Sequence, residues 1–303
     1  MSIPPSEGAS AAVSQARRTL TAIGLIVAMT VSFTLLDATA KYATQTYHPF
    51  QVVWGRYVFH FLLLLPIMLR KGPLLAFATA RPGLNLARGL MLCVVTLLFF
   101  SSIKYLPLVD AQAISFITPL TIVAIAHFVL GQKVGPRRWA AVAIGFLGVL
   151  IVIRPTGDMH WAALLCLGMA LTNSVYHLVT RSLARTDSSR VQLLYAGLTG
   201  TLLFSMLVPF VWVMPDAKGW LLLAMMGTFG AAGHYLMAEA YARATPAILA
   251  PFTYMQIVWA SVAGAVLFGH IPDSWTIFGA AIVMVAGLYV FYRERVVARE
   301  AGK

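Results

Sequence analysis

The chain has 303 residues, of which 60% are hydrophobic and 11% are charged, and its mean hydropathy is +0.82. These values exclude an ordinary soluble domain, in which about 25% of residues are charged. The net charge of +12 does not indicate a nucleic-acid partner, because the basic residues lie in short connections between apolar runs and not in one tract. The composition therefore predicts an all-α polytopic membrane protein.

Ten apolar runs, separated by charged residues, proline and glycine, predict ten transmembrane helices. Each run is near the length of about 20 residues that a helix needs to cross the hydrocarbon core of a bilayer. In chain order the predicted spans are 20–44, 49–69, 83–105, 108–130, 136–153, 159–184, 190–213, 218–240, 246–269 and 273–292. Residues 1–18 and 294–303 remain as tails outside the membrane.

The distribution of Lys and Arg predicts the orientation of these spans. If the N-terminus is cytoplasmic, most of the 22 Lys and Arg residues lie on the inner side, and those left on the outer side are Lys41, Arg56, Lys104, Arg154 and Lys218. Because Lys and Arg in short loops favour the cytoplasm, both termini are expected there. We expect the protein in the cell inner membrane, in contact with lipid.

The two halves of the chain resemble each other. A shift of about 139 positions aligns Lys104, Pro107 and Ala111 with Arg243, Pro246 and Ala250. The halves are residues 19–154 and 155–293, each with five predicted helices. Because five is odd, the second half must enter the membrane from the opposite side, so the sequence predicts a 5+5 inverted repeat of the kind found in secondary transporters.

Prolines recur in matching spans of the two halves, namely Pro119 with Pro251 and Pro66 with Pro209. Each proline removes a backbone donor and can bend its helix. Bent helices at matching positions point to a central solute path, whereas the general abundance of proline in membrane helices is the alternative.

Two stretches resemble the EamA family of the drug/metabolite transporter superfamily. The first runs from Lys104-Tyr105-Leu106-Pro107-Leu108 through Thr118-Pro119-Leu120 to Leu130-Gly131, and the second from Ala250-Pro251-Phe252-Thr253-Tyr254-Met255-Gln256 through Trp259 to Phe268-Gly269-His270-Ile271-Pro272-Asp273. The resemblance implies ten helices, cytoplasmic termini and a cavity between the halves. It also implies solutes such as amino acids and related metabolites, often exported. Gln132 and His270 stand where the family commonly has glutamate, which removes the basis for a proton role there.

Charged residues within the first two spans are candidate gate residues. Asp37 and Lys41 are four positions apart, so they share a helix face and can pair, and Arg56 falls at a similar depth in the next span. Charged side chains are costly inside a bilayer, so each needs a partner or a role. A structural ion pair with a snorkelling Lys41 is the alternative to a gate.

Polar and aromatic residues nearer the midplane are candidate solute-binding residues: Trp54, His60, Thr118, Tyr254, Gln256 and Trp259. Aromatic faces suit an apolar or cationic part of a solute, and Thr118 and Gln256 can hydrogen-bond its polar groups. Ordinary helix packing is the alternative for each aromatic residue alone. Toward the cytoplasmic side, His177 and Glu239 are further gate candidates, although Glu239 can instead pair locally with Arg243.

These observations predict a secondary transporter that exports a small amphipathic or amino-acid-like metabolite by alternating access. The family resemblance also implies the alternatives, which are import of a vitamin or nucleoside-like solute, such as riboflavin or S-adenosylmethionine, and flipping of a lipid or lipid-linked sugar. An enzyme is not expected, because zinc-protease, nucleophile-elbow and Walker motifs are absent from the sequence. No catalytic residue, metal or cofactor is predicted, Cys93 and Cys166 are interpreted as packing residues, and a homodimer remains open.

Overall fold

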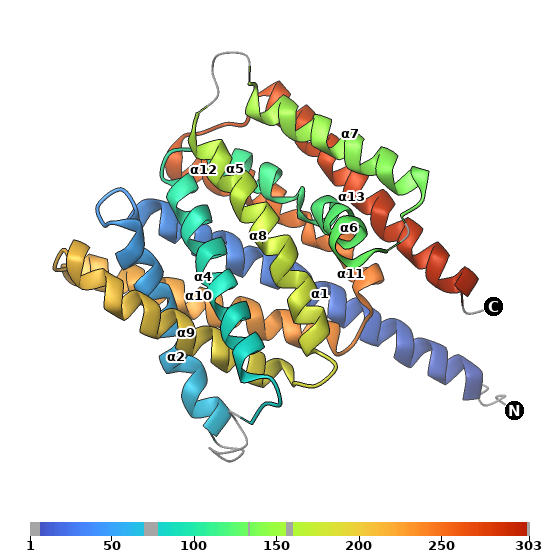
Figure 1. Cartoon of the computed structure of the whole chain (residues 1–303), viewed down its shortest axis with the longest axis horizontal. Coiled ribbons are helices and arrows are strands. Elements are labelled where there is room, and N and C mark those ends of the chain that lie inside the picture. The colour runs from blue at the N-terminus through green and yellow to red at the C-terminus, as the bar shows by residue number, and fades with distance from the viewer. Residues whose placement is uncertain (1–6, 70–77, 133, 156–159, 302–303) are drawn as a thin grey trace, which may run out of the picture.

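The computed structural model describes residues 7–69, 78–132, 134–155 and 160–301 as one helical bundle (Figure 1). Its helices are α1 Glu7–Ala43, α2 Pro49–Leu69, α4 Pro82–Ile103, α5 Leu108–Ser115, α6 Thr118–Leu130, α7 Pro136–Ile153, α8 Ala162–Leu183, α9 Ser189–Leu207, the 3-10 helix η1 Val208–Val211, α10 Ala217–Tyr241, α11 Pro246–Thr253, α12 Met255–Phe268 and α13 Ser274–Ala301. Both chain ends lie at the same end of the bundle, which we call the termini side. Among the Lys and Arg residues on which the predicted orientation depends, Arg70, Lys71 and Lys133 lie outside the described residues.

Within the described ranges, nine helical segments are long and apolar enough to cross a membrane. They correspond to the predicted spans apart from 49–69. That span is also helical, as α2, and although it is not among the nine it is as apolar as most of them. The chain is therefore a multi-pass membrane protein whose described residues hold nine candidate spans and a further helix, α2, of comparable length.

Two of the predicted spans are interrupted in the structure, each near a proline. The span 108–130 divides into α5 and α6 around Phe116, and the span 246–269 divides into α11 and α12 at Tyr254. Pro119 lies in the first turn of α6, where its missing N–H leaves no intrahelical bond unmade. Pro251 lies inside α11, near the break at Tyr254. Leu108–Leu130 and Ile248–Phe268 each remain one candidate span, and the interruptions fall close to the two prolines at which the sequence predicted bends.

The helix contacts follow the internal repeat. Helix α1 packs against α10 of the second half, and its counterpart α8 packs against α4 of the first half. In the same way α2 contacts α10 while α9 contacts α4, and the matching pairs α2 with α9 and α7 with α13 contact each other. Figure 1 shows α7 and α13 running side by side. The halves are therefore interlocked, and each helix of one half has its main neighbours in the other.

Small residues permit the close approach of α7 and α13. A Cβ added at Gly148 would lie 2.9 Å from the carbonyl oxygen of Gly279, and one added at Gly279 would lie 2.6 Å from the carbonyl oxygen of Gly148. Side chains at either position would therefore hold the two backbones apart.

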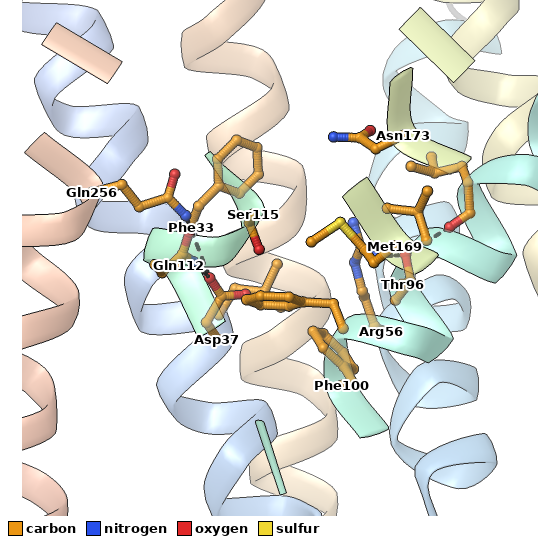
Figure 2. Close-up of a pocket in the computed structure, with 14 residues that line it drawn as sticks. Phe33, Asp37, Arg56, Thr96, Phe100, Gln112, Ser115, Met169, Asn173 and Gln256 are labelled. Atoms are coloured by element: carbon orange, nitrogen blue, oxygen red, sulfur yellow. Dashed lines mark hydrogen bonds between the residues drawn. The ribbon is translucent and has the colours of Figure 1, made fainter. Parts of the chain in front are cut away.

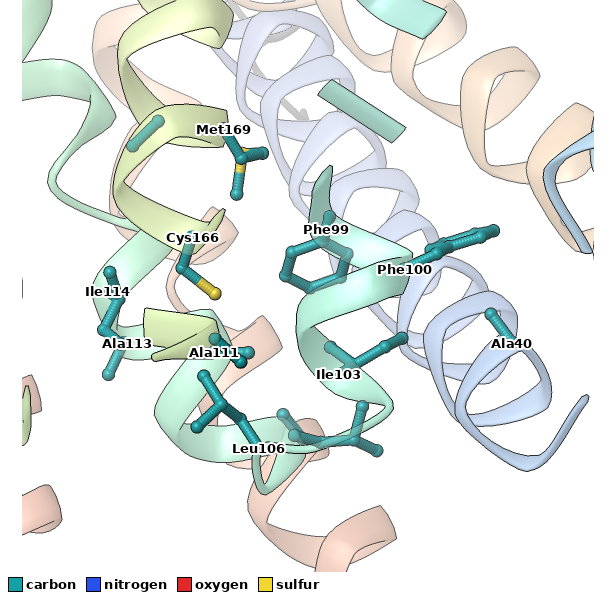
Figure 3. Close-up of a cluster of buried hydrophobic side chains, with 14 of the residues drawn as sticks. Ala40, Phe99, Phe100, Ile103, Leu106, Ala111, Ala113, Ile114, Cys166 and Met169 are labelled. Atoms are coloured by element: carbon teal, nitrogen blue, oxygen red, sulfur yellow. The ribbon is translucent and has the colours of Figure 1, made fainter. Parts of the chain in front are cut away.

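A buried apolar cluster joins α4, α5 and α8 (Figure 3). Phe100, Ile103 and Ala111 are almost fully buried in it, and so is Cys166, whose thiol donates to Ser102 Oγ at 3.0 Å. Cys93 is buried as well, and both thiols are free. The interpretation of both cysteines as packing residues agrees with this burial.

Candidate solute-binding site

A central cavity of about 240 Å³ lies between α1, α2, α4, α5, α8 and α12 (Figure 2). Its walls are mixed, because aromatic and aliphatic side chains alternate with a few polar ones. The polar lining residues are Asp37, Arg56, Thr96, Gln112, Ser115, Asn173 and Gln256. A small number of polar groups in an apolar cavity is the usual composition of a site for a small organic molecule.

Asp37 is the acidic group of this cavity and is 7% exposed. Its Oδ2 accepts from Nε2 of Gln112 at 2.7 Å and from Nε2 of Gln256 at 3.4 Å. Within the described residues, no Lys or Arg nitrogen lies within ion-pair distance of this carboxylate. Two amides, one from each half of the chain, thus orient a carboxylate whose charge no adjacent cation neutralises.

Arg56 is the basic group of the same cavity and is 9% exposed. Its guanidinium donates to Thr96 Oγ1 and lies over the rings of Tyr57 and Phe100, at 5.2 and 5.7 Å from their centroids. Figure 2 shows Asp37 and Arg56 entering the cavity from different helices. The cavity therefore presents an acid and a base that are not bonded to each other.

A second cavity of about 530 Å³ continues from the first toward the termini side. Both cavities are lined by Gln112, Ser115, Asn173 and Gln256, so this polar group lies at their junction. The wider cavity also contacts Thr118 and His177, and residues near the helix ends of α8 and α10. A solute could thus pass from the termini side to Asp37 along one polar wall.

Some of the predicted binding residues line this path. Thr118 and His177 line the wider cavity, and Gln256 lines both. Tyr254 lies beside the junction, where its ring stacks on Phe116 with centroids 4.6 Å apart.

Other predicted residues are engaged in packing. Trp54 packs edge-on against Trp212 at 5.3 Å between centroids, and its Nε1 donates to Ser205 Oγ at 3.0 Å. His60 packs edge-on against His234 at 5.5 Å. The indole nitrogen of Trp259 is buried and has no hydrogen-bond partner within the described residues.

Two gate candidates have local partners. Glu239 forms an ion pair with Arg243, as the spacing of four residues suggested. The expected pair of Asp37 with Lys41 is not formed within the described residues, because the ammonium of Lys41 donates to the carbonyls of Ile103 and Leu106 at 2.7 and 2.8 Å. The spacing of Asp37 and Lys41 predicted that they share a helix face. The ammonium of Lys41 instead binds backbone carbonyls near the end of α4, which have no intrahelical donor.

Sequence reasoning missed Gln112 and Ser115 and did not select Asn173. All three are polar residues in apolar spans, so the depth criterion that selected Thr118 and Gln256 could also have found them.

Comparison with known proteins places these features in context. The model of the EamA-like transporter family matches residues 20–154 and 160–293, one match for each half. A riboflavin transporter of Rhizobium johnstonii is 29% identical, with 94% of this chain and 95% of that protein covered. An S-adenosylmethionine uptake transporter of Rickettsia prowazekii is 25% identical, covering 88% and 90%, and a pseudopaline exporter of Pseudomonas aeruginosa is 24% identical, covering 87% and 94%. One solved crystal structure shares the fold with a TM-score of 0.63 at 18% identity, covering 95% of this chain and 99% of that one.

Proposed function

This chain belongs to the EamA-like transporter family, a family of transporters and not of enzymes, and from that premise we propose that it carries a small amphipathic or amino-acid-like organic solute by alternating access. The observation that carries the proposal is the central cavity, in which the carboxylate of Asp37 and the guanidinium of Arg56 face one space without pairing. A solute with both a cationic and an anionic group satisfies both residues at once. An apolar solute leaves both buried groups without a counter-ion, which is costly.

The amides around Asp37 support this substrate class. Gln112 and Gln256 both donate to the carboxylate and also line the cavity. Such second contacts hold the carboxylate in one orientation, so that it can select an ammonium by direction as well as by charge. The relatives named for S-adenosylmethionine, riboflavin and pseudopaline support an organic solute, and because these names differ they do not select one.

We propose export as the direction of transport. The wider cavity lies on the termini side, which the distribution of Lys and Arg predicts to be cytoplasmic, so a solute can load from the cytoplasm. An importer would release its solute through the same cavity, and two of the named relatives are an uptake transporter and a riboflavin transporter. Import of a vitamin or nucleoside-like solute is therefore the alternative, and the assay below separates it from export.

The same proposal places the protein in the cell inner membrane. It has ten spans, with α2 as the tenth, arranged as a 5+5 inverted repeat with both termini cytoplasmic. The exchange of helix contacts between the halves supports this arrangement. A homodimer is a further prediction, which the mass of the purified protein in detergent checks.

The test is untargeted metabolite profiling of cells and spent medium. Cells producing the wild type are compared with cells producing equal amounts of Asp37→Asn, and Asp273→Asn is the matched control because that acid is exposed and paired with Arg154 away from the cavity. We expect a zwitterionic solute to accumulate outside with the wild type and the control, but not with Asp37→Asn. Depletion of that solute from the medium establishes import instead.

Uptake and efflux of the identified solute by proteoliposomes then fix the direction without other cell components. No change in any solute, with all proteins present in the membrane, rejects the proposal and favours the lipid-flipping alternative.

A further inference from the structure

Lys41 ties the end of α1 to the end of α4. Its ammonium, in a side chain that is 4% exposed, donates to the carbonyls of Ile103 and Leu106 at 2.7 and 2.8 Å. Ile103 is the last residue of α4 and Leu106 lies in the turn that follows it, so neither carbonyl has an intrahelical donor, and charged donors make strong hydrogen bonds. The contact therefore closes the bundle on the side opposite the termini.

The position equivalent to Lys41 in the second half is Arg181. The chain leaves α1 and α8 through the same hydrogen-bonded turn. The amide of Tyr47 donates to the carbonyl of Ala43 at 2.9 Å, and the amide of Asp187 donates to the carbonyl of Leu183 at 2.8 Å. Counting back from Ala43 and Leu183 aligns Lys41 with Arg181.

The carbonyls that Lys41 binds also have equivalents. Helices α4 and α10 end in turns of the same kind. The amide of Leu106 donates to the carbonyl of Ser102 at 2.9 Å, and the amide of Ala244 donates to the carbonyl of Ala240 at 3.0 Å. This match is a shift of 138, one residue less than the shift that paired Lys104 with Arg243 in the sequence alone, and it aligns the two carbonyls near the end of α4 with those of Tyr241 and Ala244 near the end of α10.

The second half does not make the contact that the first half makes. Arg181 is exposed, and among the described residues it has no hydrogen bond or ion pair. It lines the wider cavity together with Tyr241. At the end of the bundle opposite the termini, Lys41 thus binds two backbone carbonyls. On the termini side, the equivalent residues Arg181 and Tyr241 both line a cavity instead.

We propose that Lys41 and Arg181 are alternating latches of the transport cycle. When the cavity opens opposite the termini, Lys41 releases the end of α4, and the guanidinium of Arg181 donates to the carbonyls of Tyr241 and Ala244. A guanidinium has several N–H donors in a fixed fork, so it can bind two carbonyls as the ammonium does. The proposal rests on alternating access, but its test needs no knowledge of the solute.

The test measures the accessibility of two matched cysteine probes to a membrane-impermeant maleimide. Ile122 lines the wider cavity, and Ala260 is its equivalent, counted from the matching breaks at Phe116 and Tyr254. Ile122→Cys reports opening on the termini side, and Ala260→Cys, whose position is 2% exposed in this conformation, reports opening on the other side. The native cysteines are buried, and the parent protein gives their background.

We expect Lys41→Ala to raise labelling of the Ala260→Cys probe by about tenfold, because it removes a charge-assisted hydrogen bond from one state, and to lower labelling of the Ile122→Cys probe. Adding Arg181→Ala should return both probes toward the parent values, because both latches are then absent. Lys41→Arg keeps the donors and should resemble the parent. Arg137→Ala removes an exposed basic residue of α7 on the termini side and is the control for the loss of charge.

The two probes also separate a latch from a merely structural lysine. General loosening of the bundle raises labelling at both probes, and that outcome overturns the proposal, as does unchanged labelling in Lys41→Ala. If the probes respond in opposite directions while no solute is transported, the latches stand and the proposed solute class fails.

Discussion

The ring of Phe116 stacks on the ring of Tyr254, with centroids 4.6 Å apart and planes 28° from parallel. The two residues occupy equivalent positions, because each ends a short helix at the break of an interrupted span. The breaks therefore meet at the centre of the molecule, beside the junction of the two cavities. Each break supplies an aromatic face to the other half, and this contact fixes how the two halves pack there.

The contact between Tyr254 and α13 gives a test of this packing. A Cβ at Gly287 would overlap the hydroxyl oxygen of Tyr254, and that hydroxyl is buried without a hydrogen-bond partner in the described residues. We expect Gly287→Ala to lower stability by about 1–3 kcal/mol and Tyr254→Phe to be neutral or stabilising. The double variant should recover most of the loss. Thermal unfolding in detergent measures this, and additive effects of the two changes would contradict the contact.

The hydrogen bonds to Asp37 predict unequal roles for its two amide partners. Gln112 donates at 2.7 Å and Gln256 at 3.4 Å. Gln112→Leu should therefore cost more stability than Gln256→Leu, at about 1–3 kcal/mol, because it leaves a buried carboxylate poorly bonded. Combining Gln112→Leu with Asp37→Leu should cost less than the sum of the single changes. Equal costs for the two glutamine variants, measured by thermal unfolding, would argue against this network.

The close approach of α7 and α13 predicts that alanine is not tolerated at their crossing. Gly148→Ala and Gly279→Ala each place a methyl group against a backbone carbonyl, at 2.9 and 2.6 Å. Because a backbone carbonyl cannot move aside as a flexible side chain can, we expect losses of about 1–3 kcal/mol. Gly24→Ala in α1 is the control, since nothing lies within 4 Å of its Cβ position, and helix propensity there favours alanine. A similar melting temperature for all three variants would be inconsistent with the crossing.

The ion pair between Arg154 and Asp273 predicts a pH dependence. The hydrogen bond from Arg154 holds the pKa of Asp273 below its usual value of 3.8. Because the pKa is lowered in the folded state, the stabilisation is present above about pH 4 and is lost as the pH falls through the folded-state pKa. Both side chains are more than a third exposed, so Asp273→Asn should cost no more than about 1 kcal/mol at pH 7. Melting temperatures of the two proteins should converge as the pH falls below about 4, and a constant difference would contradict this assignment.

The sequence was sufficient for the helices but not for their interruptions. Apolar runs locate spans because a bilayer requires a fixed length of apolar helix. Proline at 119 and 251 suggested bends, but whether a helix bends or divides depends on the tertiary contacts at Phe116 and Tyr254, which a linear pattern does not contain. The internal repeat was visible in the sequence because matching turns of the two halves contain similar residues.

The candidate solute-binding site was also only partly predictable from the sequence. Thr118 and Gln256, which depth in the membrane selected as binding candidates, line a cavity, and Asp37, which was selected as a gate candidate, lines one as well, whereas binding itself stays a prediction. Depth could not separate them from Trp54, whose ring packs against Trp212, because packing partners on distant helices are not encoded by depth. Lys41 was assigned to the wrong partner, since the carbonyls it binds become available only when α4 ends beside it.

The interlocked packing of α1 with α10 and of α8 with α4 has a consequence for assembly. Neither half buries its apolar surface by itself. The two halves of this single chain therefore depend on each other for folding, as the subunits of an obligate heterodimer do. Cutting the chain between the halves should therefore give two fragments that are degraded when made singly and that complement each other when made together.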